Sequence, residues 1–325
     1  MIIVARIDPT LSIRVIGSRQ LRYSDAPPAD QIEPPAADWV AAGDDRPPHV
    51  RAASGLAFSH GRLAVIQDDT AFIATVAGNE VAAILLPRGV GGRRRFEVAL
   101  GNKADKLDLE SCIAIGDDLY AFGSGSSPLR ERIAHIGYAT QLLDASPLYR
   151  MMRDELNGPV NIEGVAAVGR ELWMFHRGNS GGDDRGPAIV RFARTGLMAW
   201  IAGDGPVPEP TDSKRYDLGS VGGVRYGFTD AVGVGDRAFY IAAAEDSPNA
   251  IDDGAVLGSQ LGVIEMGPDG ERVARAAPLE VDGAPLKAEG LAFDPKDPAR
   301  VWVATDPDNV DEPSRLYELE LVGPW

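Results

Sequence analysis

Polar residues, mostly acidic, recur in this chain where a short apolar segment begins. Glu163 opens the first segment of NIEGVAAVGRELWMFHRGN, in which a turn separates two apolar segments. Four more stretches repeat this pattern. The residues that open the five copies are Ser54, Glu110, Glu163, Asp230 and Glu289. Carboxylates held close together do not all stay ionised unless a cation lies among them or their pKa values rise.

The chemistry that these residues suggest is cation binding. Ca²⁺ prefers oxygen ligands such as carboxylates, amides and backbone carbonyls. The pattern therefore predicts a divalent cation, of the Ca²⁺ type by its ligands, held by Glu110, Glu163, Asp230 and Glu289. In the alternative, each acid accepts backbone N–H groups of a neighbouring segment and locks the fold. The fourth copy has a shorter turn, so either Asp230 or Thr229 fits its opening position.

A histidine and an arginine end the third copy, in the sequence FHRGN. A tight hairpin about Gly169 and Arg170 would bring His176 opposite Glu163. A carboxylate beside an imidazole tunes a general base, and a guanidinium binds a carboxylate or phosphate in two places. We therefore assign Glu163, His176 and Arg177 as candidate catalytic residues. In the alternatives, His176 is a satisfied polar strand end and Arg177 neutralises the acids.

The spacing of the copies indicates the fold that positions them. Their opening residues are 56, 53, 67 and 59 residues apart, which is typical of propeller blades. We predict an all-β chain, a single β-propeller domain over residues 1–325 with five blades. A degenerate sixth blade, in the N-terminal segment or in 203–226, is the alternative. The predicted blades span residues 54–100, 108–144, 160–202, 228–276 and 287–322.

The N-terminal segment carries no copy of the pattern but contains two short predicted strands. These strands cover residues 2–7 and 11–16, around the turn at Pro9. Since the last blade has no outer strand of its own, one of them would complete it and close the ring, which removes exposed sheet edges. Ser146–Leu156 is the clearest predicted helix, with proline in its first turn and apolar residues at helical spacing.

Antiparallel hairpins bring their first and last residues to the same end, so all five polar ends would meet at one mouth of the channel. The loop Gly123–Arg132 combines hydroxyls, glycines and arginines, and would either bind an anion or form a simple turn. The residues that we expect to line the mouth as ligand-binding residues are Asp68, Asp69, Ser124, Ser126, Asn179, Glu245, Asp246 and Asp306.

Composition limits the partners of the chain. Its 325 residues carry a net charge of −16, which argues against nucleic acid or an anionic membrane and is compatible with a small-molecule ligand or a cation. The single cysteine, Cys112, lies in an apolar segment and is expected in the core. The N-terminus lacks a signal-peptide pattern, and no apolar run is long enough to span a membrane, so a cytoplasmic protein is expected.

Several motifs give the chain a family resemblance: SGLAF, FGSGSSP, NIEG, HRGN, FTDA, DDGAVLGSQLGV and AEGLAFDP. Along nearly its whole length the chain resembles an uncharacterised bacterial β-propeller family, a domain of unknown function. More distantly, the E-G pairs are similar to those of phytase-like esterase and gluconolactonase/senescence-marker propellers. That resemblance implies a central cation, with Glu163 and Glu289 as the best-matched ligands and Glu110 and Asp230 next. Ser54 departs from the pattern, as does the count of five motifs where six blades are usual.

Two functions follow from these observations. In the first, the mouth is a metal-dependent hydrolase site for a small ester, lactone or phosphoester, in which Arg177 orients the substrate. His176 or a free carboxylate would be the base. In the second, the protein is a non-catalytic propeller that binds a ligand or serves as a scaffold.

Overall fold

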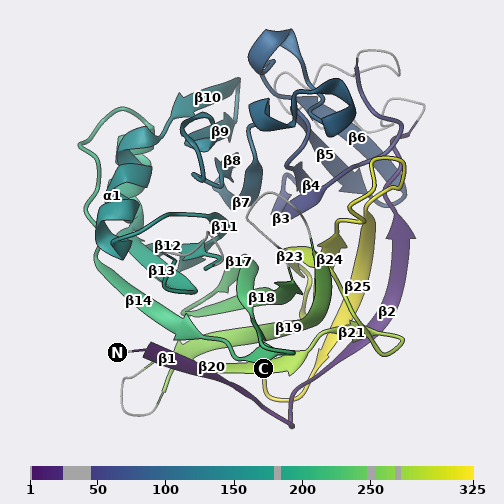
Figure 1. Cartoon of the computed structure of the whole chain (residues 1–325), viewed down its shortest axis with the longest axis vertical. Coiled ribbons are helices and arrows are strands. Elements are labelled where there is room, and N and C mark those ends of the chain that lie inside the picture. Colours follow the sequence, from purple (N-terminus) through teal and green to yellow (C-terminus); the bar gives the residue numbers. More distant parts are fainter. Residues whose placement is uncertain (1, 25–44, 179–183, 247–253, 268–271) are drawn as a thin grey trace.

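The chain folds into a ring of β-sheets around a central axis, as seen down that axis in Figure 1. This computed structural model describes residues 2–24, 45–178, 184–246, 254–267 and 272–325. The fold is all-β and propeller-like, which confirms the predicted class.

The first two sheets each consist of four consecutive antiparallel strands. The first contains β3 (Ala53–Ser59), β4 (Arg62–Gln67), β5 (Phe72–Ala77) and β6 (Glu80–Leu85). The second contains β7 (Leu109–Ile115), β8 (Asp118–Gly123), β9 (Arg132–Ile136) and β10 (Thr140–Asp144). Short 3₁₀ turns lie between or within them at Val90–Gly92, Val98–Leu100, Lys103–Asp105 and Pro128–Arg130.

A nine-stranded sheet follows, made of two groups of four strands that β1 (Ile2–Ile7) joins. The first group is β11 (Ile162–Val168), β12 (Glu171–His176), β13 (Ala188–Ala193) and β14 (Asp212–Asp217). The second is β17 (Gly227–Val234), β18 (Arg237–Asp246), β19 (Ala255–Met266) and β20 (Arg272–Pro278). Strand β1 lies parallel to both β14 and β20, so it bridges the outer strands of the two groups.

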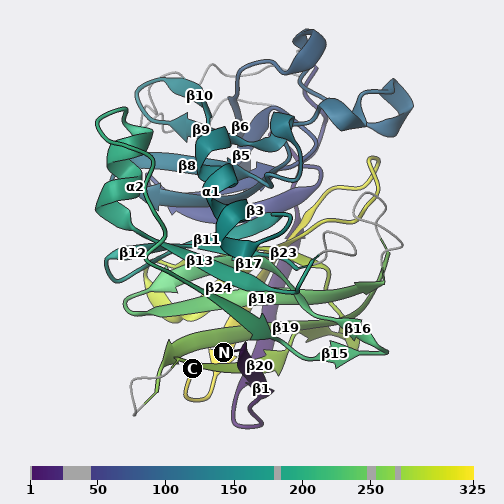
Figure 2. The same ribbon diagram turned by 60° about the vertical axis from the view of Figure 1, so that its left-hand side comes forward.

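The last sheet pairs the two ends of the chain. It consists of β23 (Ala288–Asp294), β24 (Asp297–Thr305), β25 (Arg315–Val322) and β2 (Ser12–Gln20). The N-terminal segment therefore does supply the outer strand of the last sheet, through the second of its two predicted strands. Figure 2 shows β1 and both chain ends on the same side of the molecule.

Smaller elements decorate the ring. Two-stranded ribbons form from β15 (Ser220–Val221) with β16 (Val224–Arg225), and from β21 (Glu280–Val281) with β22 (Ala284–Pro285). Helix α1 (Ser146–Leu156) has the predicted bounds, and Ala145 occupies its N-cap position without a side-chain hydrogen bond. The sequence analysis did not predict α2 (Arg194–Ile201). Neither α1 nor α2, the α-helices of the described ranges, has the length and apolarity to cross a membrane.

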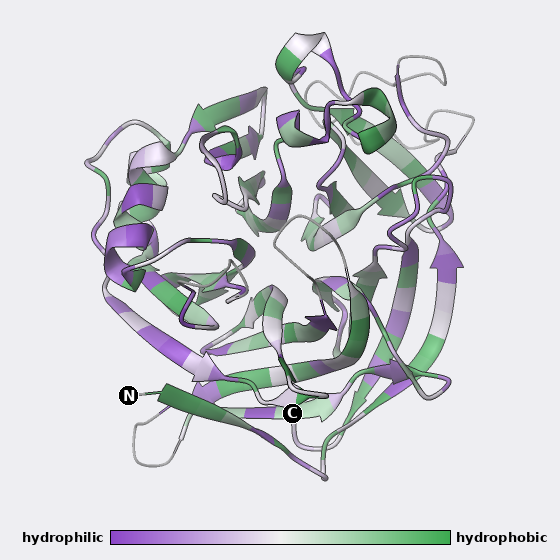
Figure 3. Ribbon diagram, viewed as in Figure 1, coloured by the Kyte–Doolittle hydropathy of each residue, from purple (hydrophilic) through white to green (hydrophobic). Residues whose placement is uncertain are grey.

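The innermost strands β3, β7, β11, β17 and β23 contact one another in cyclic order and close the ring. Apolar side chains fill the space between neighbouring sheets. Phe72 packs in the same cluster as Leu316, and Phe122 in the same cluster as Met174. Burying one such side chain stabilises a protein by roughly 1.5–3 kcal/mol. Cys112 lies in one of these clusters, as predicted, and Figure 3 shows the hydrophobic residues concentrated along the strands.

Candidate functional site at the mouth of the ring

Each innermost strand begins with a β-bulge, and the extra residue of the bulge is the recurrent polar residue. In β11 the register shifts between Ile162 and Gly164, so Glu163 has no partner of its own in β12. A bulge redirects the side chain of its unpaired residue, which explains why these residues turn away from the sheets. The equivalent residues of the five strands are Ser54, Glu110, Glu163, Thr229 and Glu289.

This register corrects one assignment. In β17 the shift lies between Phe228 and Asp230, so Thr229 occupies the recurrent position and Asp230 is the residue after it. The sequence left both options open because the turn of this hairpin is short. The prediction that Asp230 is equivalent to the three glutamates is therefore wrong.

The glycine that follows the bulge in three strands permits close approach between innermost strands. A Cβ atom at Gly164 would lie 2.8 Å from the backbone nitrogen of Ala231, and one at Gly290 would lie 2.8 Å from Leu56. Distances under 3.0 Å force the neighbour to move, so the E-G pairs combine a redirected acid with a tight inter-strand contact. The recurring glycine is a packing feature of the ring.

Two of the five recurrent residues have a purely structural role. The Ser54 hydroxyl donates a hydrogen bond of 2.7 Å to the carbonyl of Leu109 at the start of the next innermost strand. The Thr229 hydroxyl donates one of the same length to Ala288, again on the next strand. These bonds tie neighbouring sheets together through hydroxyls that donate to carbonyls, whereas the structural alternative has acids that accept backbone N–H groups.

Asp230, near the start of β17, bonds backbone groups of neighbouring innermost strands. Its two carboxylate oxygens accept the backbone N–H groups of Ala231 and Leu291, both at 2.7 Å, and Leu56 also donates to it. The side chain is 1% exposed. Burial raises the pKa of Asp230 well above its usual range, although these backbone N–H groups oppose the rise. Since both oxygens serve backbone groups, Asp230 is not placed to ligate a cation with Glu110.

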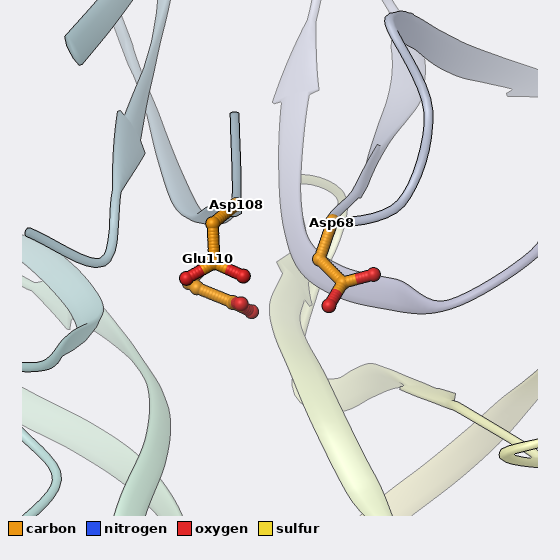
Figure 4. Close-up of side chains that lie close together, drawn as sticks. All are labelled: Asp68, Asp108 and Glu110. Atoms are coloured by element: carbon orange, nitrogen blue, oxygen red, sulfur yellow. The ribbon is translucent and has the colours of Figure 1, made fainter. Parts of the chain in front are cut away.

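Three other carboxylates converge at the mouth, as Figure 4 shows. Oxygen atoms of Asp68, Asp108 and Glu110 all lie within 4.8 Å of one another. Asp68 follows the end of β4, Asp108 precedes β7, and Glu110 is the bulge residue of β7. Sequence spacing identified Asp68 and Glu110 but missed Asp108.

Cations of the protein already contact two of these three acids. Lys106 Nζ lies 2.6 Å from an oxygen of Asp108 and also bonds Asp68, and Arg130 lies 2.9 Å from the other Asp108 oxygen. Burial alone would raise the pKa of Asp108, but Lys106 and Arg130 lower it overall. Glu110, by contrast, receives no hydrogen bond or ion pair from any described residue, and it is only partly buried.

The loop after β8 supplies further donors to Asp108. The hydroxyl of Ser124 donates to Asp108, and Ser126 lies 2.9 Å from both Ser124 and Arg130. Tyr149 of helix α1 holds this loop in two ways. Its hydroxyl donates a hydrogen bond to the carbonyl of Gly123, and its ring packs against Gly125, where a Cβ atom would lie 2.1 Å from the ring. The anion that this loop contacts is thus the carboxylate of Asp108.

The other side of the mouth carries a second group of charges. Arg177 lies 3.5 Å from Glu163 and also bonds Glu245, while Asn161 donates a 2.6 Å hydrogen bond to Glu163. Lys287 bonds Asp308 and lies 4.0 Å from Glu245. Arg177 therefore joins β12 to β18 through ion pairs.

Burial and mutual repulsion raise the pKa values of four of these carboxyls, whereas that of Asp108 is lowered. The pKa of Glu110 is raised well above its usual range by burial and by Asp108, Glu163 and Asp68. Burial raises the pKa of Glu163 to about 7 and that of Glu289 to about 8, although Arg177 opposes both shifts. Burial also raises the pKa of Asp306 to about 7, with Lys287 opposing and Asp68 adding to the rise. These carboxyls therefore act on one another's charge.

His176 is part of the scaffold around the mouth. It is 1% exposed. Its Nδ1 accepts the backbone N–H of Asn161 at 3.0 Å, and its Nε2 lies 3.1 Å from Asp184. The accepted bond at Nδ1 leaves the proton on Nε2, which donates to Asp184. Both ring nitrogens are therefore occupied.

The remaining predicted residues differ in their surroundings. Asp69 pairs with Arg51, and burial together with Asp68 raises its pKa to about 6. Asp246 is exposed at the end of β18. Asn179 lies outside the described residues.

Sequence reasoning missed Asp108, Lys106 and Lys287. Asp108 stands two residues before Glu110, and Lys287 two residues before Glu289. The sequence therefore shows a charged residue two positions before the bulge residue in both β7 and β23.

The Asp68–Asp108–Glu110 cluster fits a hard divalent cation in ligand type and spacing. Ca²⁺ takes oxygen ligands at about 2.3–2.6 Å, so opposite ligands lie about 5 Å apart. The carboxylate oxygens of the cluster lie within 4.8 Å of one another, which is within that span. Glu110 is the acid of the cluster without a direct ion pair in the described residues, and Lys106 competes with an ion for Asp68 and Asp108.

The chain matches one family model, described as "Family of unknown function (DUF6929)", over residues 49–321. No curated protein matches it in sequence.

Similar solved structures are remote in sequence. A gluconolactonase from Xanthomonas campestris is 13% identical, with 83% of this chain and 72% of that chain covered at a TM-score of 0.38. A mannose phosphorylase from Leishmania mexicana is 13% identical, with 94% and 88% covered at 0.43. A glutaminyl cyclase from Myxococcus xanthus is 10% identical, with both chains fully covered at 0.26. At these scores we draw no conclusion about activity.

Proposed function

The chain belongs to the DUF6929 family, whose function is unknown, and we propose that its mouth binds a divalent cation of the Ca²⁺ type. Asp68, Asp108 and Glu110 would hold the ion. We further propose that this mouth hydrolyses a small ester, lactone or phosphoester. The ring would be a single five-bladed propeller over residues 1–325, with each innermost strand as the first strand of a blade.

One observation supports this proposal above the others. Three carboxylates from two neighbouring sheets place oxygens within 4.8 Å of one another, and Glu110 has no hydrogen bond or ion pair with any described residue, although Lys106 partly offsets its charge. A cation beside Glu110 would stabilise the ionised form of this carboxyl, whose pKa is raised by burial and by the neighbouring acids. The opposite side of the mouth adds Glu289, which is 8% exposed and has no ion pair with any described residue.

A bound divalent cation would polarise the carbonyl or phosphoryl oxygen of the substrate and lower the pKa of water. The chain's own residues would move the protons. Glu163, with a pKa raised to about 7, would accept a proton from the attacking water. Glu289, with a pKa raised to about 8, would donate one to the leaving oxygen. Arg177 and Asn161 would orient Glu163 through their contacts with its two oxygens.

His176 would position this site without taking part in proton transfer. Its two ring nitrogens already bond Asn161 and Asp184, so it would fix the backbone next to Glu163. A free carboxyl is therefore the better base.

A second function, non-catalytic ligand binding, rests on a different observation. Arg177 is committed to Glu163 and Glu245, which leaves less of its guanidinium for a substrate. If the ion pairs of the mouth are permanent, the mouth would bind a metabolite or a basic segment of a partner without reaction.

An activity screen separates the two functions. The chain would be assayed against panels of lactones, carboxylic esters and phosphoesters after removal of metal and after addition of Ca²⁺, Mg²⁺, Mn²⁺ or Zn²⁺. The hydrolase proposal predicts metal-dependent turnover that falls at least about 100-fold in Glu163→Gln. Asp117→Asn, an exposed change in the β7–β8 turn, is the matched control. Turnover that Glu163→Gln leaves intact would refute the assigned base, and no turnover with any ion would favour the binding function.

A further inference from the structure

A cavity of about 410 Å³ opens beside the mouth, between the segment before β3 and the loop between β24 and β25. Small-molecule sites commonly have volumes of about 300–1,000 Å³. The residues that line the cavity are Arg22, Pro47, Pro48, His49, Arg51, Arg95, Glu97, Val310 and Asp311. None of these residues takes part in the proposed hydrolase site.

The cavity is a locally basic region of an acidic protein. Three guanidinium groups and two carboxylates line it, whereas the whole chain has a net charge of −16. Arg51 is 4% exposed and is satisfied by Asp69 and by Glu97 at 2.8 Å. Arg51 contacts one oxygen of Glu97 and Arg95 lies 3.6 Å from the other, so two guanidinium groups share this carboxylate.

Arg22 and Arg95 retain unused donors. Arg22 contacts only the side-chain oxygen of Gln20, at 3.3 Å, and has no carboxylate within ion-pair distance in the described part of the chain. Arg95 has ion pairs of 3.6 Å with Glu97 and 3.7 Å with Asp45, both longer than a good hydrogen bond. A guanidinium carries five N–H donors, so both side chains can still bind an anion.

His49 adds an unsatisfied polar atom to the same wall. Its Nε2 lies 3.2 Å from the carbonyl of Val310, to which it donates, and the side chain is 4% exposed. Its buried Nδ1 has no hydrogen-bond partner among the described residues. Burial lowers the pKa of His49, with Arg22 and Arg51 contributing, so the imidazole is neutral and Nδ1 is an acceptor. Buried polar groups without a partner are rare in proteins, and an acceptor such as this Nδ1 would bond a water or a hydroxyl of a ligand rather than its anionic group.

We propose that this cavity binds a small organic anion. The carboxylate or phosphate group of the ligand lies between the guanidinium groups of Arg22 and Arg95. Its apolar body lies against Pro47, Pro48 and Val310. The site is separate from the cation site, so it neither requires nor excludes the proposed hydrolysis.

Calorimetric titration with three probes of one shape tests the proposal. Phenyl phosphate, benzoate and the neutral benzyl alcohol would be titrated into the full chain at constant ionic strength with metal removed. We expect the phosphate, the carboxylate or both to bind, the alcohol to bind at least tenfold more weakly, and the two anions to reveal the preferred group. Binding of neither anion, or equal binding of the alcohol, would overturn the proposal.

Variants locate the site. Arg22→Gln and Arg95→Gln should each weaken anion binding about tenfold, whereas Arg170→Gln, in the exposed β11–β12 turn, should not. Glu110→Gln removes a proposed cation ligand and should leave anion binding unchanged. Arg22 is exposed, so Arg22→Gln is expected to fold, which circular dichroism checks. Anion affinity that survives both arginine substitutions would place the anion elsewhere and refute the site.

Discussion

Glu110 and Asp230 are both acids at the start of an innermost strand, yet their surroundings are opposite. Asp230 follows the bulge of β17, and backbone N–H groups of Ala231 and Leu291 occupy its two oxygens. Glu110 is the bulge residue of β7 and faces Asp68 and Asp108. Asp230 and Glu110 thus differ by one residue in their position relative to the bulge. The first bonds backbone groups of the ring, and the second is free of such bonds in the described structure. We infer that hydrogen bonds from backbone N–H groups distinguish the structural acid, Asp230, from Glu110, the proposed cation ligand.

The largest loss of stability is expected at Asp230, because backbone N–H groups bond its carboxylate. Asp230→Ala would leave buried N–H groups without an acceptor, each at about 1–3 kcal/mol. We expect the free energy of unfolding in urea to fall by about 3 kcal/mol or more. Asp117→Asn should change it by less than about 0.5 kcal/mol. A loss under about 1 kcal/mol for Asp230→Ala would show that the backbone does not need this carboxylate.

The pH dependence of the free energy of unfolding tests the raised pKa values of Glu163 and Glu289. Glu163 and Glu289 have pKa values raised to about 7 and about 8, against about 4.3 in an unfolded chain. Between about pH 4.5 and pH 8 the folded state therefore binds more protons than the unfolded state. The free energy of unfolding must fall as pH rises through this window. We expect a loss of a few kcal/mol without divalent cations, measured by urea unfolding from pH 5 to pH 8.

Calcium should offset that loss. An ion at the mouth compensates the carboxylates when they ionise, so the added stability should be larger at pH 8 than at pH 5. A stability that rises over this window in the absence of metal would contradict the assigned pKa directions.

Lys106 tests whether the protein's own cation competes with a metal. Lys106→Met removes the ammonium that contacts both Asp68 and Asp108. We expect the affinity for Ca²⁺ to rise about tenfold, which equals about 1.4 kcal/mol. The melting temperature should drop without Ca²⁺ and recover with it. Unchanged or weaker Ca²⁺ binding would indicate that the cluster is a structural ion-pair network with Lys106 as its permanent cation.

The smallest expected effect concerns the recurrent position that carries a hydroxyl. Ser54→Ala removes a single hydrogen bond to the carbonyl of Leu109. We expect a loss of about 1 kcal/mol in the free energy of unfolding and no change in cation affinity. Altered Ca²⁺ binding in Ser54→Ala would mean that this position belongs to the cation site after all.

The repeat in the sequence was sufficient for the fold, because each copy encodes a hairpin with its own turn and apolar segments. It also identified Glu110, Glu163 and Glu289 as equivalent residues, since a bulge residue recurs at a fixed place in each hairpin. The register of β17 could not be predicted, because a one-residue bulge leaves Thr229 and Asp230 equally compatible with the pattern. Strand β1 was predicted at residues 2–7, but its place between β14 and β20 was not, because it pairs with strands more than 200 residues away. Helix α2 was not predicted from the sequence.

The ion-pair and hydrogen-bond partners of the site residues could not be predicted from the sequence, because they come from segments that only the tertiary structure brings together. Lys106 reaches Asp68 across two sheets, and His176 reaches Asp184 through a loop whose path the sequence does not encode. Spacing predicts which residues share an opening, but not which of them neutralise one another. This is why the sequence suggested His176 as a base, whereas its hydrogen bonds favour a positioning role.

Calorimetric titration of Ca²⁺ into the metal-free chain at pH 8, for the wild type and Glu110→Gln, tests the central claim most directly. The account predicts one ion bound per chain, binding at least tenfold weaker in Glu110→Gln, and unchanged binding in the control Asp117→Asn. The absence of Ca²⁺ binding to the wild type, or equal affinity in Glu110→Gln, would contradict a cation site at this mouth.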